Sequence, residues 1–91
     1  MTDADILQMT KHNLAIAGAT WNEYLTSLIG AAKQAIGREG IVLDVNDIED
    51  CNLIVMYTAY LYRKRADDDP QMPRMLRYAL NNRLLSVKAR E

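Results

Sequence analysis

Cysteine and histidine are almost absent from this chain of 91 residues. Cys51 is its one cysteine and His12 its one histidine. A single cysteine excludes an internal disulfide and is typical of proteins from a reducing compartment. Because no second cysteine or nearby histidine is available to share a metal, we interpret Cys51 as a small apolar core residue. His12 lies off the apolar line of its predicted helix, so we expect it at the surface without a catalytic or ligand role.

The motifs of the common enzyme classes are also missing. The sequence has no glycine-rich phosphate loop and no Ser/His/Asp set that the single histidine completes convincingly. No carboxylate stands in an apolar segment where burial would raise its pKa for acid–base work. We therefore expect no enzymatic activity and no cofactor, and the candidates for function are surfaces.

Membrane-spanning and secretory segments are the third absence. The apolar stretch at residues 51–62 includes Asn52 and Thr58 and is too short and too polar to cross a bilayer. The first residues, MTDADILQ, lack the basic start and the long apolar segment of a signal peptide. We expect an intracellular product with no membrane partner.

The composition that remains is that of an ordinary globular protein, with 49% hydrophobic and 25% charged residues. A chain of this length forms one domain at most and buries only about 60–65% of its unfolded surface. Its stability is therefore expected to be modest, or to come partly from neighbours in an assembly. We expect a single all-α domain over residues 1–91, a compact bundle of about four helices in which the third is central.

The first two helices are predicted from apolar spacing and capping signals. Asp3 can cap the first helix, whose apolar face contains Ile6, Leu7, Thr10 and Leu14. A capping box at residues 20–23, TWNE, is predicted to begin the second helix. Gly30, Ala31 and Ala32 in its middle would let another helix approach closely, and Gly37 and Gly40 are expected to end it.

The third and fourth helices are predicted in the second half of the chain. Residues 51–65, CNLIVMYTAYLYRKR, are apolar on nearly every side until three cations close the stretch, which is typical of a helix inside a core. Pro73 is predicted to occupy the first position of the last helix, where its missing N–H is not needed. The segment 72–91 is basic and amphipathic, and its predicted apolar face consists of Met75, Leu76, Ala79, Leu80 and Leu84.

Two acidic segments suggest a metal site, but neither has the pattern of one. Between residues 44 and 50, Ile48 stands where a calcium ligand should be, and no glycine supplies the sharp turn. We expect these acids to cap the third helix instead. The alternation of Ile41, Leu43 and Val45 allows a short extended segment just before them. The three aspartates at residues 67–69 are interpreted as a solvated loop, so no metal is expected.

The net charge of −1 conceals an asymmetry. Residues 1–50 contain eight acids and three bases (−5), whereas residues 51–91 contain eight bases and four acids (+4). A bipolar chain can bind nucleic acid at its basic end. It can equally bind copies of itself, the acidic flank of one copy meeting the basic flank of the next. A third interpretation is that the charges are spread over a solvated surface.

Three stretches together resemble one protein family: LTSLIGAAKQAIGREG, VMYTAYLYRKR and MPRMLRYALNNRL. In this order they are similar to the phage head–tail connector (adaptor) family, small helical proteins of tailed phages and prophages. The resemblance covers roughly Asp3 to Ala89, and residues 72–84 are its most distinctive part. It implies a structural virion protein, made in the bacterial host cytoplasm, that forms a ring of about twelve subunits beneath the portal.

The resemblance also implies partners. They are other copies of the chain, the portal protein and a neck or tail-completion protein, while DNA passes through the ring only as cargo. The C-terminal segment of related connectors reaches the portal, which makes these residues portal-contact candidates: Met72, Arg74, Arg77, Asn81, Asn82 and Arg83.

A ring needs a contact between two different patches, and the charge asymmetry supplies a hypothesis for it. In that hypothesis Glu23, Asp47, Glu49 and Asp50 of one copy face Arg63, Arg65 or Arg77 of the next. The alternative function is a small helical DNA-binding protein that uses residues 63–65 and the basic last helix on phosphates. The mildly acidic pI of about 5.8 and the lack of a helix–turn–helix signature favour the connector.

Overall fold

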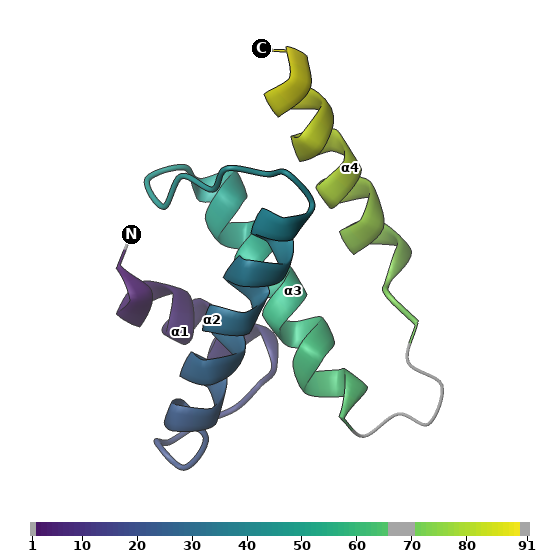
Figure 1. The fold of residues 1–91 in the computed structure, drawn as a ribbon. Helices are drawn as coiled ribbons and strands as arrows, with labels where there is room; N and C mark the ends of the chain where they lie inside the picture. Colours follow the sequence, from purple (N-terminus) through teal and green to yellow (C-terminus); the bar gives the residue numbers. More distant parts are fainter. Residues whose placement is uncertain (1, 66–70, 90–91) are drawn as a thin grey trace.

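A computed structural model describes residues 2–65 and 71–89, and these residues form a helical bundle. Its helices are α1 (Asp3–Asn13), α2 (Asn22–Arg38), α3 (Ile48–Lys64) and α4 (Arg74–Ala89) (Figure 1). The expected all-α fold with about four helices is confirmed. No strand occurs in the described residues, and the segment around Leu43, where the sequence allows a short extended segment, is a loop. Residues 67–69, predicted to be a solvated loop, lie outside the described part of the chain.

The third helix is central, as predicted, because α3 packs against all the other helices. Its buried side chains surround the helix rather than forming one stripe, and Cys51 and Ile54 are fully buried. The prediction that Cys51 is a core residue is confirmed, and its thiol donates a hydrogen bond to the Val45 carbonyl over 3.2 Å. The rest of the core comes from the other helices and one loop: Ile6, Leu25, Ile29, Ala32, Ile36, Ile41, Leu76 and Leu80.

The first helix begins differently from the prediction. Thr2, not Asp3, is the N-cap: its hydroxyl accepts a hydrogen bond from the Asp5 N–H over 3.2 Å. In return, the Thr2 N–H donates to the Asp5 carboxylate over 2.9 Å, which completes a capping box. Asp3 instead forms an ion pair with Lys33 of α2 at 2.6 Å. His12 is exposed on α1, as predicted.

The capping box makes the start of α1 sensitive to acid. The Thr2 N–H, helped by the Thr2 hydroxyl, holds the pKa of the Asp5 carboxyl below its ordinary value of 3.8. Because the folded state has the lower pKa, the stabilisation is fully present above pH 3.8 and is lost as pH falls through the folded pKa. We expect a carboxyl NMR titration to place the Asp5 midpoint below 3.8, and Thr2→Ala to move it upward. A wild-type midpoint at or above 3.8 would contradict the capping box.

The predicted limits of α2 need correction at both ends. No capping box forms at residues 20–23, because the helix begins at Asn22 with Trp21 in the N-cap position and no side-chain cap. Gly37 lies inside the helix, which ends at Arg38. Gly40, in the left-handed region with φ of +95°, reverses the chain after the helix as expected. Of the small residues predicted to allow a close helix approach, Gly30 is exposed and a Cβ there would meet nothing within 4 Å, whereas Ala32 is fully buried.

The last helix is set apart from the other three and runs beside α3 (Figure 1). It begins at Arg74, and the carbonyl of Pro73 accepts the N–H of Arg77 over 3.1 Å. Leu76 and Leu80 are its buried residues, while Leu84 packs partly buried against the core. One side of α4 is therefore anchored on the bundle, and the other side faces outward.

Candidate interaction surfaces

The acidic residues before α3 shape the loop and cap the helix. Asp47 is the N-cap, and its carboxylate accepts the N–H of Glu49 over 2.9 Å. The Asp44 carboxylate accepts the N–H of Asn46 over 2.9 Å, and the Asp50 carboxylate accepts the N–H of Asp44 over 2.8 Å. The prediction that these acids cap the third helix is confirmed at Asp47.

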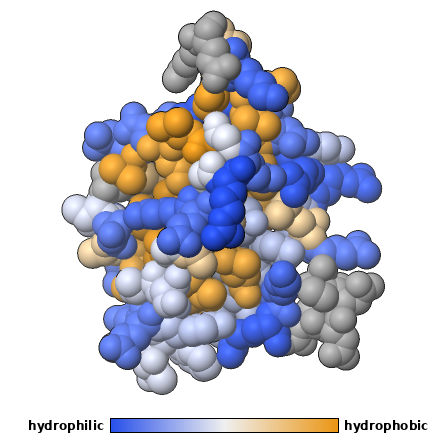
Figure 2. Space-filling view, in the orientation of Figure 1, coloured by the Kyte–Doolittle hydropathy of each residue, from blue (hydrophilic) through white to orange (hydrophobic). Residues whose placement is uncertain are grey.

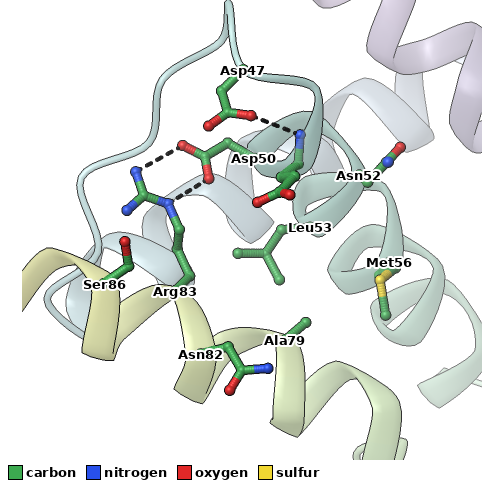
Figure 3. A pocket seen from close by; sticks show the side chains of 10 residues that line it. Asp47, Asp50, Asn52, Leu53, Met56, Ala79, Asn82, Arg83 and Ser86 are labelled. Atoms are coloured by element: carbon green, nitrogen blue, oxygen red, sulfur yellow. Dashed lines mark hydrogen bonds and ion pairs between the residues drawn. The ribbon is translucent and has the colours of Figure 1, made fainter.

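One of these acids is a buried charge that binds α4. The Asp50 side chain is almost fully buried and receives two hydrogen bonds from Arg83: Nε to Oδ1 at 2.6 Å and Nη2 to Oδ2 at 3.1 Å (Figure 3). Arg83 also donates to the Val42 carbonyl over 3.1 Å. The Asp50 carboxylate raises the pKa of Arg83 above its ordinary value, so the guanidinium stays charged. We call the pair of hydrogen bonds from Arg83 to Asp50 the Asp50–Arg83 fork. Together with the bond to the Val42 carbonyl, it holds α4 against the start of α3 and the loop before it.

The structure corrects the roles predicted for these two residues. Asp50 was expected at the ring contact and Arg83 at the portal, but each is bonded to the other inside the chain. Asp50 is fully buried although it stands outside the apolar segment of the sequence. A local signal existed: Asp50 precedes Leu53 and Ile54 by three and four residues, which places it on their face of the helix. It was missed because α3 begins three residues earlier than predicted.

A groove of about 370 Å³ lies between the first half of α3 and α4. Leu53, Met56 and Ala79 give it an apolar part, and its polar lining includes Asn52, Asn82 and Ser86 (Figure 3). The groove offers apolar contact together with amide and hydroxyl groups.

The outward side of α4 is a second apolar face. Met75 is 73%, Tyr78 56% and Leu85 64% exposed. Together with Asn82 and Ala89 they repeat at intervals of three and four residues, which places all of them on one side of the helix. We call these five residues the outer face of α4. The prediction that Met75 shares the core face with Leu76 is wrong, because one residue later the helix has turned by about 100°.

A second exposed apolar surface lies where the loop enters α3. Val42 is 75%, Val45 39% and Ile48 59% exposed, and they alternate with acidic residues. We call this surface the 42–49 patch; its members are Val42, Asp44, Val45, Asp47, Ile48 and Glu49. Figure 2 shows apolar side chains gathered beside hydrophilic ones at the upper left, over the loop between α2 and α3. The patch contains no basic residue.

A cluster of aromatic rings surrounds Arg65 at the other end of α3. The Arg65 guanidinium carbon lies 4.7 Å from the Trp21 ring centre, 4.6 Å from that of Tyr62 and 5.6 Å from that of Tyr24. Such cation–π contacts contribute about 0.5–1 kcal/mol each at exposed sites. Arg65, predicted to contact a neighbouring subunit, therefore joins the start of α2 to the end of α3 within its own chain. Trp21 serves this cluster rather than a capping box.

Some of the other predicted contact residues are simply exposed, whereas others already contact residues of their own chain. Arg77 is exposed but forms an ion pair with Glu39 at 2.9 Å. Burial, reinforced by Glu39, raises the pKa of the nearby Tyr57 hydroxyl. Met72 is half-buried and packs against the core. Among the remaining candidates, the N-cap residue Asp47 is half-buried. The others are exposed at the surface: Glu23, Glu49, Arg63, Arg74, Asn81 and Asn82.

Comparisons with protein-family models, with curated proteins and with solved structures found no significant match for this chain. Within residues 2–65 and 71–89, none of the helices combines the length and apolar character that a bilayer span requires. The assignment of function therefore depends on the exposed surfaces and on how the chain distributes its charges between them.

Proposed function

We propose that this chain is a structural subunit of a phage or prophage head–tail junction, a connector that forms a ring and acts by binding other proteins. The observation that supports the proposal is the outer face of α4. A helix with large apolar side chains on two opposite faces packs one of them in its own chain and presents the other to a partner. Here Leu76 and Leu80 are buried, whereas Met75, Tyr78 and Leu85 remain exposed.

The charges of the two exposed apolar surfaces support a ring in particular. A ring requires a heterologous contact, in which one patch meets a different patch on the next copy. The 42–49 patch has three acids and no base, whereas α4 has four cations and no acid. In Figure 1 the tip of the α2–α3 loop and α4 lie on opposite sides of α3. Successive copies can therefore join head to tail. Each contact buries apolar surface that a domain of 91 residues is too small to bury by folding alone.

The remaining partners of a connector belong to the same proposal. The exposed Arg74 and Asn81 are the residues of the C-terminal segment that suit contact with a portal protein, because Asn82 belongs to the outer face of α4. A neck or tail-completion protein would bind the opposite end of the ring, and DNA would pass through the lumen as cargo. In this proposal the chain has its place in the virion, at the junction between head and tail.

The alternative of a DNA-binding protein is supported by Arg63, Lys64, Arg74 and Lys88, which are exposed. The other described cations of the basic half are less available. Arg77 and Arg83 are paired with Glu39 and Asp50, and Arg65 is stacked on aromatic rings. This distribution favours the connector over a phosphate-binding surface.

The mass of the chain in solution tests the proposal. We expect light scattering over a concentration series to show a discrete species of about ten or more subunits, which weakens but persists at high salt. A mass of 10.3 kDa at every concentration would contradict a ring that forms from the chain alone. Duplex DNA added to the same samples is the control. Binding whose affinity falls steeply with salt would favour the alternative, because several phosphate contacts have that signature.

A further inference from the structure

We propose that the outer face of α4 in one copy binds the 42–49 patch of the next copy. This inference rests on the proposed function and specifies the contact from which the ring is built. Both surfaces present three large exposed apolar side chains: Met75, Tyr78 and Leu85 on one side and Val42, Val45 and Ile48 on the other.

The charge of α4 excludes the simplest competing partner, a second α4. The spacing of the outer face would suit a pair of helices, because it alternates steps of three and four residues. However, α4 carries Arg74, Arg77, Arg83 and Lys88 and has no acidic residue. Two such helices side by side would bring like charges together, which disfavours the complex. The partner of α4 should therefore be acidic as well as apolar.

The 42–49 patch has both properties. Asp44, Asp47 and Glu49 alternate with its apolar residues, and no base lies among them. On α4, Arg74 directly precedes the outer face and Lys88 lies three residues beyond Leu85. The cations and acids can therefore flank a shared apolar centre, which fixes the register while the apolar contacts supply most of the affinity.

The large apolar side chains of both surfaces are exposed in the single chain, so they are available to a different molecule. The Asp50–Arg83 fork and the packing of Leu76 and Leu80 hold the inner side of α4 on the bundle. Of the outer face, Asn82 lines the groove that Asp47 and Glu49 also line, while the side chains of Met75, Tyr78 and Leu85 stay exposed. A second copy presents its exposed patch to the outer face of the first copy. The outer face of that second copy then remains exposed for the patch of a third copy.

Two variants with opposite charges test this pairing. Ile48→Lys places a cation in the patch, where it opposes the cations of α4, and Leu85→Glu places an acid on the outer face, where it opposes the patch. Both side chains are exposed, so circular dichroism should show an unchanged fold. We expect each variant alone to self-associate about tenfold more weakly or worse. Gln8→Glu and Gln34→Lys, exposed positions on α1 and α2, are charge-matched controls that should assemble like the wild type.

Mixing the two variants gives the decisive result. Each supplies the intact surface that the other has lost, so native mass spectrometry should show assemblies with equal numbers of both. If Ile48→Lys still self-associates while Leu85→Glu does not, α4 binds a surface other than the patch and the inference is overturned. Wild-type assembly that neither variant weakens also overturns the pairing but leaves the proposed function standing. A wild-type chain that is monomeric at every concentration overturns both.

Discussion

The Arg83→Leu variant is expected to lose about 3–5 kcal/mol of its free energy of unfolding, because the substitution removes the cation that neutralises a buried carboxylate. Asp50 is fully buried, and Arg83 donates to both of its carboxylate oxygens. Domains of this size have total stabilities of about 5–15 kcal/mol, so the loss removes a large share. Urea denaturation followed by circular dichroism measures the change as a lower midpoint.

Two further variants separate the buried charge from other effects of the substitution. Arg77→Leu removes a cation from the same helix, but its ion pair with Glu39 is exposed and should be worth only about 0–1 kcal/mol. The double variant Asp50→Leu/Arg83→Leu removes both buried charges and should recover most of the lost stability, since an apolar pair replaces them. If Arg83→Leu destabilises the chain no more than Arg77→Leu does, the fork does not hold α4 as described.

The fork also affects how assembly experiments are interpreted. Arg83 orients α4 by bonding to Asp50 and to the Val42 carbonyl, so its loss would disturb both the outer face and the 42–49 patch. A variant of Arg83 is then expected to assemble poorly without contacting any neighbour. Leu85 and Ile48 are better probes of the contact, because their side chains contribute little to the fold.

The general fold could be predicted from the sequence, because it follows from local spacing. Apolar residues at helical intervals identified the four helices, and the run of apolar side chains around Ile54 identified the central one. Helix ends were less predictable. Several residues near an end can cap it, and tertiary contacts decide which does: Thr2 forms a box with Asp5, whereas Trp21 is drawn into the cluster with Arg65.

The candidate surfaces were predictable only in part, because the charge asymmetry of the sequence does not show which charged residues pair with each other inside the folded chain. Asp50 and Arg83 are 33 residues apart, and no local pattern connects them. In the folded chain Asp50 and Arg83 bind each other, and Arg65 and Arg77 also contact residues of their own chain. These charges are therefore less available to a partner. The outer face of α4 was also hidden, since a helix with two apolar faces was interpreted as one with a single broad face. Only the direction in which α3 lies distinguishes Met75 from Leu76.

The second large effect is expected for Ile54→Ala, which should reduce the free energy of unfolding by about 2–5 kcal/mol. Ile54 is fully buried in the middle of α3, where the other helices converge. The truncated side chain leaves a cavity that closely packed neighbours can fill only partly, so the lost contacts add to the lost transfer free energy. Urea denaturation should show a lower midpoint with an unchanged slope.

Ile48→Ala is the matched control, because the same side chain is shortened six residues earlier in the same helix. Ile48 is exposed, so its truncation should change stability by only about 0.5 kcal/mol or less. Equal losses at the two positions would contradict the burial pattern of α3. If the 42–49 patch binds the next subunit, the order reverses in an assembly measurement at low temperature, where both variants remain folded. Ile48→Ala then weakens self-association while Ile54→Ala does not, because one isoleucine belongs to the fold and the other to the contact.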